Sequence, residues 1–166
     1  LSHDAIHALH VDSVGTLWIG TNAGLDRFDA ATGTVQRVAG DETLGGERVR
    51  TIWRDSAGAL WVGTQDGGLS RTDDGGQTFR NYQSGNAYGS LSNNRVEAVL
   101  EDSQQRLWIA TADGLNRFIP SIDGFSVHRY SASDPKSLAD SNTISLFQDS
   151  GWLLWVGTKT AGVSKW

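Results

Sequence analysis

The chain has 166 residues, 38% of them apolar and 20% charged, a composition that is typical of a folded domain and argues against a disordered segment. Its formal net charge of -5, with no basic run, argues against nucleic acid and anionic membranes as partners. It has no cysteine, which excludes disulfides and thiolate metal sites. No apolar run approaches the roughly 20 residues of a membrane-spanning helix, so we expect no direct membrane insertion.

A five-residue motif recurs four times, as LWIGT at 17–21, LWVGT at 60–64, LWIAT at 107–111 and LWVGT at 154–158. Its tryptophans are 43, 47 and 47 residues apart, an aspartate precedes each of them by six residues, and a leucine precedes each aspartate by eleven. Such fixed offsets indicate an internal repeat. The repeat divides the chain into four units, at about 1–43, 44–90, 91–137 and 138–166.

Each unit consists of short strands separated by turns. The first unit predicts strands at 6–11, 17–21, 25–28 and 34–38, and the turn DSVG after the first strand is typical of a hairpin. The next units predict strands at 48–54, 60–64, 69–72 and 78–82, then at 95–101, 107–111, 115–118 and 125–130. The last unit predicts strands at 143–148, 154–158 and 163–166, with no outer strand after them. No stretch has helical periodicity.

A tandem unit of four antiparallel strands over about 40–50 residues is typical of a β-propeller blade. We therefore predict an all-β fold: a β-propeller of four consecutive four-stranded antiparallel blades, the last without its outer strand. Both faces of the LWIGT strand are apolar or small, so both should be covered by neighbouring blades. We expect Trp18, Trp61, Trp108 and Trp155 to fill the space between blades, and the small residue two positions later to let the next sheet approach.

The units resemble the two-component regulator propeller repeat, whose pattern is L-S-x-x-x-V-x-x-I-x-x-D-x-x-G-x-L-W-I-G-T, a turn, and G-L-x-x-F. Residues 1–28 match it almost throughout, and residues 91–118 nearly as well. Residues 44–72 and 138–166 depart from it further, with Ala139 in place of the serine and Trp152 where a turn glycine is expected. The resemblance implies the periplasmic sensor region of a bacterial hybrid histidine kinase or diguanylate cyclase. Some members of the family sense oligosaccharides.

The resemblance also implies rings of about seven blades. Four blades should then form part of a larger ring. Since the chain contains no methionine, not even at position 1, we expect it to be a segment of a longer protein. An arc of blades leaves its first and last sheets uncovered, so we also expect protein–protein contacts through the terminal blades.

A second signature lies at 72–79, where TDDGGQTF resembles the Asp-box hairpin of sialidase propellers. The matching residues are Thr72, Asp74, Gly76, Thr78 and Phe79. This box stabilises a turn and lies far from catalysis, and an arginine triad, a tyrosine nucleophile and an acid cannot be assembled from this sequence. The match therefore indicates a turn and not an enzyme.

Residues shared by all units are interpreted as framework, and residues that differ at equivalent loop positions as candidates for ligand contact. By this rule Asp12, Asp55, Asp102 and Asp149 cap turns. The threonines that end the motif, Thr21, Thr64, Thr111 and Thr158, should hydrogen-bond within the next turn. The basic residues at one shared position, Arg27, Arg71, Arg117 and Lys165, either form an anion-binding ring or pack their stems on neighbouring blades, and the second interpretation is favoured.

The histidines predict no metal or catalytic site. His7 and His10 are three residues apart on one strand, so their side chains leave opposite faces and cannot share a metal. His3 lies in the loop that enters the first blade, where solvation is the simpler interpretation. Neither a phosphate-binding loop nor a nucleophile–histidine arrangement is found. We expect no catalytic residue, metal or cofactor.

The candidate ligand site is formed by the loops at one end of the blades. In a propeller, the connection between blades and the turn between the second and third strands open on the same face of the disc. Here both are rich in Asn, Asp, Arg and Ser, which suits a saccharide or another polar small molecule. The candidate residues are Asn22, Gln65, Asp66, Tyr88, Asn94, Arg95, Asp113, Asn142 and Lys159.

The sequence favours a non-catalytic ligand-sensing or interaction module that passes binding to a separate output domain. Two alternatives stay open: an enzyme on a propeller scaffold, such as a lyase or glycosidase, and a purely structural scaffold for protein–protein contacts.

Overall fold

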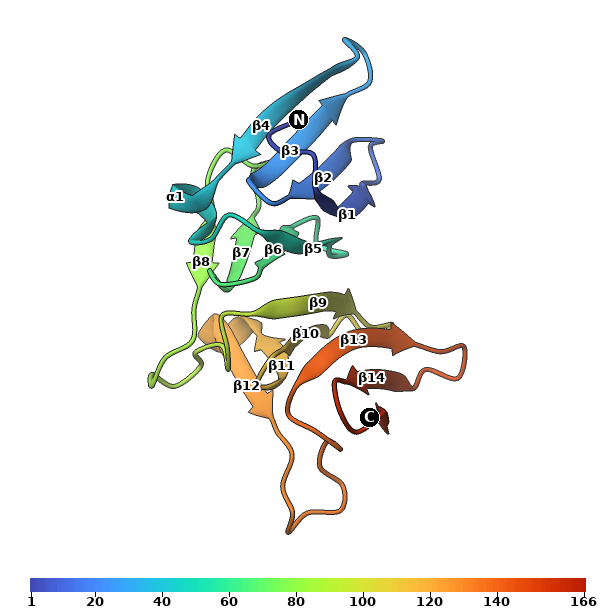
Figure 1. Cartoon of the computed structure of the whole chain (residues 1–166). Coiled ribbons are helices and arrows are strands. Elements are labelled where there is room, and N and C mark those ends of the chain that lie inside the picture. The colour runs from blue at the N-terminus through green and yellow to red at the C-terminus, as the bar shows by residue number, and fades with distance from the viewer.

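The computed structural model describes residues 1–166, apart from the side chain of Asp41. The described residues form four antiparallel sheets, each made of strands that are consecutive in the chain (Figure 1). The first contains β1 (Ile6–Val11), β2 (Leu17–Thr21), β3 (Gly24–Asp29) and β4 (Thr34–Ala39). The second contains β5 (Val49–Arg54), β6 (Leu60–Thr64), β7 (Leu69–Thr72) and β8 (Arg80–Tyr82). The third contains β9 (Val96–Glu101), β10 (Leu107–Thr111), β11 (Gly114–Ile119) and β12 (Gly124–His128). The fourth contains β13 (Thr143–Gln148), β14 (Leu154–Thr158) and β15 (Val163–Lys165).

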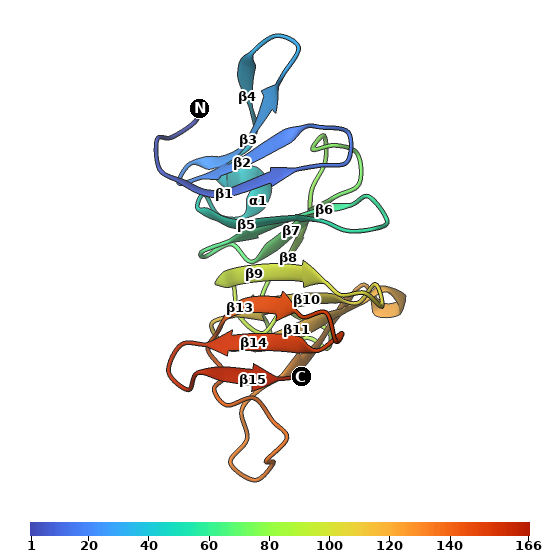
Figure 2. The ribbon, with the colours of Figure 1, turned by 90° about the vertical axis from the view of Figure 1, so that its right-hand side faces the viewer.

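This architecture confirms the predicted all-β propeller of four consecutive blades, with three strands in the last blade of the described chain. The sheets are stacked in chain order, and the first strands of neighbouring blades, β1, β5, β9 and β13, lie side by side (Figure 2). Two short helices, α1 (Asp41–Leu44) and η1 (Pro120–Ile122), lie in connections between strands. They were not predicted, because segments this short leave no periodic pattern in a sequence. No helix among the described residues is long and apolar enough to cross a membrane.

The Asp-box segment forms the predicted turn, and β8 therefore begins at Arg80 instead of at residue 78. Asp74 accepts hydrogen bonds from the Thr72 hydroxyl at 2.8 Å and from the Thr78 hydroxyl and backbone N–H at 2.6 and 3.0 Å. The Thr78 bonds, followed by that from Thr72, hold the pKa of the Asp74 carboxyl well below its usual range.

The apolar core lies between blades and not within them. At the interface of the second and third blades, Trp61 and Leu69 pack against Val96, Val99 and Ile109. Trp18 takes the equivalent place between the first and second blades, and Trp108 between the third and fourth. These three tryptophans are at most 3% exposed, which confirms the prediction for them.

Trp155 is less buried than these three tryptophans. No sheet of the described residues covers its side of the last blade. For the same reason Val163 is 61% exposed, whereas the equivalent Leu69 is fully buried. The first blade has the complementary bare face, where Leu9 is 64% exposed and its counterpart Ile52 is 7% exposed.

The glycine of the repeated motif permits close approach of the next sheet, as predicted. A Cβ atom at Gly20 would lie 2.5 Å from Cγ1 of Val49, which belongs to the first strand of the second blade. A Cβ atom at Gly63 would lie equally close to Val96 of the third blade. Any side chain here would therefore force the blades apart.

The repeated aspartates cap their turns, as predicted, and also bind the tryptophans. Each accepts the indole N–H of the tryptophan six residues later, in the pairs Asp12–Trp18 at 3.1 Å, Asp55–Trp61 at 2.7 Å, Asp102–Trp108 at 2.8 Å and Asp149–Trp155 at 2.7 Å. The repeated threonines donate to the carbonyl of the turn glycine, in the pairs Thr21–Gly24, Thr64–Gly68, Thr111–Gly114 and Thr158–Gly162. The same side chains thus build the same framework in every blade.

A polar contact joins each pair of neighbouring blades at the hairpin end, where the last residue of a first strand reaches the Asp-Ser turn of the preceding blade. We call these contacts latches. They are Arg54 Nη1 to Asp12 at 2.7 Å, Ser56 Oγ to Glu101 at 2.8 Å, and Ser103 N to Gln148 Oε1 at 2.8 Å. The last residue of the first strand thus supplies a guanidinium at the first junction, a carboxylate at the second and an amide at the third.

Candidate functional site

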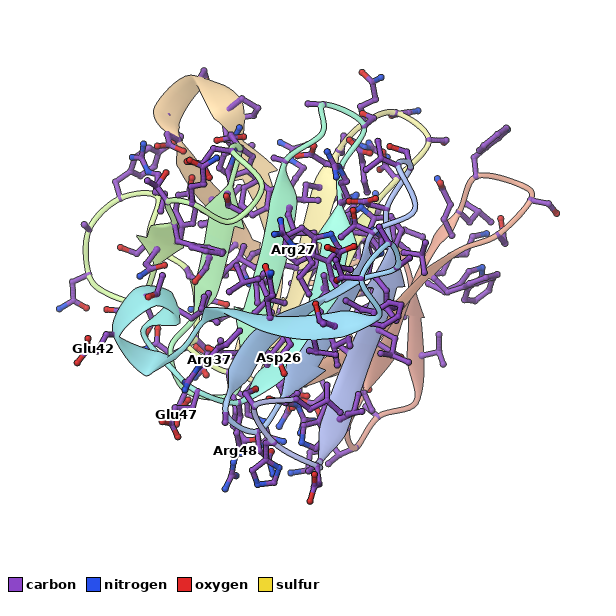
Figure 3. The ribbon with its side chains drawn as sticks, turned by 90° about the horizontal axis from the view of Figure 1, so that it is seen from above. Asp26, Arg27, Arg37, Glu42, Glu47 and Arg48 are labelled. Atoms are coloured by element: carbon purple, nitrogen blue, oxygen red, sulfur yellow. The ribbon has the colours of Figure 1, made fainter. Side chains whose placement is uncertain are left out.

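Apart from Tyr88, the predicted site residues lie in connections at the end of the blades opposite the latches, which we call the loop face. In each blade the first turn residue after the second strand donates its backbone N–H to the segment before the first strand. The pairs are Asn22–Ala5, Gln65–Arg48, Ala112–Arg95 and Lys159–Asn142, with N–O distances of 3.1, 2.9, 3.1 and 2.9 Å. The two connections therefore lie side by side, as predicted. Figure 3 shows Arg48 at this end of the molecule, with Arg27 nearer the opposite end.

A β-bulge interrupts every first strand close to the loop face. The pairing register with the second strand shifts by one residue in each blade, and the extra residues are His7, Arg50, Glu97 and Ile144. A bulge re-aims a side chain away from the regular alternation of a strand, and bulges are frequent next to functional sites. The four extra residues differ completely in chemistry, although the strands around them are alike.

The bulge residues of the first two blades contact the neighbouring turns. His7 Nε2 lies 2.6 Å from Asn22 Oδ1. Arg50 Nη1 donates to Gln65 Oε1 at 3.5 Å, a long hydrogen bond. In both blades the turn between the second and third strands is thus linked through a side chain to the bulge of the first strand.

Glu97 joins the second and third blades by binding two guanidinium groups. Its Oε2 accepts hydrogen bonds from Nε and Nη2 of Arg50 at 3.2 and 2.7 Å, and its Oε1 accepts one from Nε of Arg95 at 2.6 Å. The Glu97 side chain is 6% exposed, while those of Arg50 and Arg95 are 32% and 42% exposed. The carboxylate is therefore buried beneath two arginines that face the solvent.

Two asparagines stand beside this group, and their amide oxygens are already used. Asn93 Oδ1 accepts the backbone N–H of Arg95 at 2.8 Å, and Asn94 Oδ1 accepts that of Ser84 at 2.6 Å. The backbone carbonyl of Asn94 also accepts the N–H of Gly68, in the turn that carries Gln65. We call Arg50, Gln65, Asn93, Asn94, Arg95 and Glu97 the loop-face cluster.

The structure does not bring the other predicted residues into this cluster. Asp113 forms an ion pair with Arg129 at 3.1 Å. Tyr88 is 92% exposed and lines, with Arg129, a cavity of about 420 Å³ along the outer strand β12. The remaining candidates lie in turns of the loop face: Asn22 in the first blade, Asp66 in the second, and Asn142 and Lys159 in the fourth.

Arg50, Asn93 and Glu97 were not predicted as site residues. Arg50 and Glu97 lie in segments whose sequence is typical of regular strands, whereas the predicted site residues lie in loops. Comparison of the first strands would have marked Arg50 and Glu97, because these strands vary in charge at only two positions, that of His7, Arg50, Glu97 and Ile144 and that of the latch residues.

The repeated basic residues pack on aromatic rings. The guanidinium carbon of Arg71 lies 5.3 Å from the Trp61 ring centroid and 6.0 Å from that of Phe118 in the next blade. Arg117 lies 6.0 Å from the Trp108 centroid. These two arginines therefore pack on neighbouring aromatic side chains, which agrees with the favoured interpretation and not with an anion-binding ring.

Comparison with known proteins supports this description of the repeats. Residues 1–23 and 90–113 match the sequence pattern of the family described as Two component regulator propeller. No curated protein sequence is significantly similar to the chain.

Several solved structures have a similar fold. The extracellular domain assigned to the hybrid two component system BT3049 from B. thetaiotaomicron has a TM-score of 0.82 and 23% identity, over 99% of this chain and 23% of that chain. PorZ, a surface component of the type-IX secretion system of Porphyromonas gingivalis, has a TM-score of 0.71 and 14% identity, over 95% and 25%. Virginiamycin B lyase from Staphylococcus aureus has a TM-score of 0.69 and 14% identity, over 100% and 57%.

At these identities the likeness to solved structures shows the fold alone, and the chain spans between 23% and 57% of the three proteins. The matched family pattern covers parts of the first and third blades, and the structure gives all four blades the same aspartate–tryptophan framework. The chain has a β-propeller fold, and its first and third blades carry matches to the two-component regulator propeller repeat.

Proposed function

We propose that the chain is a non-catalytic ligand-sensing module of a bacterial signalling protein, located outside the cytoplasm, which passes ligand binding to a separate output domain. The family of its repeats and the fold shared with the extracellular domain of a two component system support this role. The proposed ligand is a saccharide or another polar small molecule.

One observation carries the proposal: the blades share their framework and differ at the bulges of the loop face. The Asp–Trp and Thr–Gly hydrogen bonds are repeated in all four blades. At the bulge the same backbone position presents an imidazole, a guanidinium, a carboxylate and an alkyl group in turn. The last residue of the first strand varies as well, but its side chain is used in the latches. Variation beside a set of loops, on a framework that is otherwise repeated, is typical of a recognition surface.

Two alternatives are less well supported. An enzyme is suggested by the likeness to virginiamycin B lyase, but 14% identity shows only the fold. In the loop-face cluster both oxygens of Glu97 are occupied by guanidinium donors, so this carboxylate is not free to take a proton from a substrate. A purely structural scaffold does not account for the blade-to-blade differences in the bulges.

The test is calorimetric titration of the purified chain with a panel of neutral and acidic oligosaccharides. We expect Gln65→Ala to weaken binding while changing the free energy of unfolding by less than about 0.5 kcal/mol, because Gln65 lies in a surface turn and its side chain makes only one long hydrogen bond. Gln36→Ala removes an exposed amide on the outer strand β4 and serves as the matched control. Turnover of any glycoside in the panel would contradict a non-catalytic role, and no binding to any saccharide would contradict the proposed ligand class.

A further inference from the structure

We infer that the loop face binds an anionic saccharide, whose carboxylate or sulfate group is held by the loop-face cluster with Arg95 at its centre. The inference rests on the proposed function, because it names the ligand class of the same site. Three features of the cluster carry it: its net charge, the state of its hydrogen-bonding groups, and the exposure of its arginines.

The charge of the cluster is positive. Arg50 and Arg95 share the single carboxylate of Glu97, which leaves one positive charge uncompensated within the cluster. The negative partner is the buried member and the positive partners are the exposed ones, so an approaching ligand meets guanidinium groups first. Arg48 adds another exposed guanidinium on the same face (Figure 3), and no described residue forms an ion pair with it.

The cluster also has more free hydrogen-bond donors than free acceptors, which again favours an anion. The amide oxygens of Gln65, Asn93 and Asn94 each accept a hydrogen bond within the protein. Their amide nitrogens donate to no described residue, and the same is true of the terminal nitrogens of Arg95. The acceptors of the cluster are therefore occupied and its donors are free. A ligand that satisfies it must bring acceptors.

The geometry of Arg95 suits a planar or tetrahedral oxyanion. Its Nε is fixed on Glu97 at 2.6 Å, which orients the guanidinium plane and leaves the two terminal nitrogens as a pair of parallel donors. A guanidinium group binds carboxylate and sulfate oxygens through such a pair, and charge-assisted bonds of this kind are the stronger class. The neighbouring asparagine amides add neutral donors suited to sugar hydroxyls.

Carboxylates on the loop face should weaken the binding of an anionic ligand by electrostatic repulsion, and this effect gives the inference a second test. Asp66 is exposed, lies next to Gln65 in the same turn, and pairs with no described cation. Glu47, which precedes Arg48 in the chain, is also exposed. Removal of the Asp66 charge should therefore strengthen the binding of an anion and leave the binding of a neutral sugar unchanged.

The experiment is titration of the chain with trigalacturonate, with galactotriose as the neutral counterpart and with a sulfated chondroitin disaccharide as the second source of negative charge. We expect one or both anions to bind and galactotriose to bind at least about tenfold more weakly. Affinity for the anion should fall as sodium chloride is raised from about 50 to about 300 mM. Arg95→Gln should weaken anion binding about tenfold or more, and Asp66→Asn should strengthen it.

Arg80→Gln is the matched control, because it removes one positive charge from the outer strand β8, where Arg80 pairs with Asp123. An equal loss of affinity in Arg80→Gln and Arg95→Gln would reflect net charge alone and overturn the inference. Equal binding of the neutral and acidic trisaccharides, unaffected by Arg95→Gln, would overturn it while the proposed saccharide-sensing function stands. No binding of any of the three probes would contradict both. The melting temperature of each variant shows whether it is folded.

Discussion

The Asp102 carboxylate accepts the indole N–H of Trp108 at 2.8 Å, while its other oxygen accepts the backbone N–H groups of Gln104 and Arg106 at 2.9 and 3.0 Å. The Asp102 side chain is fully buried, and Trp108 is 3% exposed. One carboxylate thus closes a turn and satisfies the single polar atom of a core tryptophan, which would otherwise be buried without a partner.

Asp102→Ala should therefore destabilise the chain by about 1–3 kcal/mol, the usual penalty for leaving a buried donor unsatisfied. Asp149→Ala is the matched control, because Trp155 is only half-buried and water can replace the lost acceptor. Urea unfolding followed by tryptophan fluorescence measures both. An equal loss in the two variants would show that the buried indole bond is not the source of the effect.

The capping aspartates should make the fold sensitive to acid. Burial alone would raise the pKa of the Asp102 carboxyl, but hydrogen bonds from Trp108 and Arg106 outweigh it and lower the pKa below its usual value. The pKa of Asp12 is lowered in the same way, against burial, by Trp18 and by backbone N–H groups of its turn. As the pH falls, the unfolded chain therefore takes up protons before the folded chain does.

The stability contributed by these groups is complete above the unfolded pKa of about 3.9 and is lost as the pH falls through the lower folded pKa. Unfolding measured at a series of pH values should show a decline that begins below about pH 4 to 5. Asp102→Asn removes one of the titrating groups, so its stability should decline less steeply. An unchanged slope in this variant would contradict the assignment to Asp102.

The contact between Gly20 and Val49 predicts a strong coupling between two blades. Gly20→Ala places a methyl group 2.5 Å from Cγ1 of Val49 and should destabilise the chain by about 1–3 kcal/mol, as overpacking usually does. Val49→Ala alone should also destabilise, since the residue is fully buried. The double variant should lose less than the sum of the two single losses, because the second change makes room for the first. If the two single losses of stability are strictly additive in the double variant, the predicted coupling between Gly20 and Val49 is contradicted.

Trp152 adopts a left-handed backbone conformation, with φ of 67°, at the turn position where Gly15 and Gly58 have φ of 85° and 93°. Its side chain is 67% exposed and therefore has little packing to lose. Trp152→Gly should stabilise the chain by up to about 1 kcal/mol, because the left-handed conformation costs a non-glycine residue about 1–2 kcal/mol, and the entropy of glycine offsets part of the gain. Gln105→Gly, at the equivalent turn with φ of 59°, should act in the same direction in the same thermal-unfolding assay. A loss of stability in Trp152→Gly would indicate that the ring is held by contacts.

The first and last blades expose the two halves of the interface that joins blades within the chain. Leu9 is 64% exposed and Val163 is 61% exposed, while their counterparts in the inner blades are buried. We expect the chain to associate head to tail through these faces, because each is complementary to the other and not to itself. Leu9→Glu and Val163→Glu should each weaken association measured by light scattering.

Mixing the two variants gives the decisive measurement for this prediction. Leu9→Glu keeps the intact last blade, and Val163→Glu keeps the intact first blade, so the mixture should form a dimer through one unaltered interface. A chain that stays monomeric at all concentrations, or variants that fail to combine, would count against association through these faces.

Much of the framework could be predicted because the same residues recur at the same spacing in all four units. The spacing from Asp102 to Trp108 indicated a turn followed by a core residue. The hydrogen bond between them could not be predicted, because it depends on how the two strands of the hairpin pair. The lower burial of Trp155 could not be predicted, since its motif is the same as that of Trp61 and burial depends on a neighbouring sheet that the motif does not describe.

The candidate site was found only in part, for a similar reason. Gln65, Asn94 and Arg95 lie in loops, where differences between repeats are easy to see. Arg50 and Glu97 lie in segments that read as regular strands, and nothing in VRTIWR or VEAVLE marks the extra residue of a bulge. Only the paired backbone shows that these two side chains are turned toward each other across a blade interface.

The latches bear on how four similar repeats find their proper order during folding. Tandem repeats of similar sequence are prone to misassembly, because a blade can stack on the wrong neighbour. The Asp12 carboxylate, 2% exposed, is matched by the guanidinium of Arg54, whereas Glu101 or Gln148 in that place would leave it beside a second carboxylate or a neutral amide. The first-strand half of each latch differs between blades, whereas its Asp-Ser half is the same, so the latches disfavour some misordered stacks, above all one that places Glu101 against the buried Asp12 carboxylate.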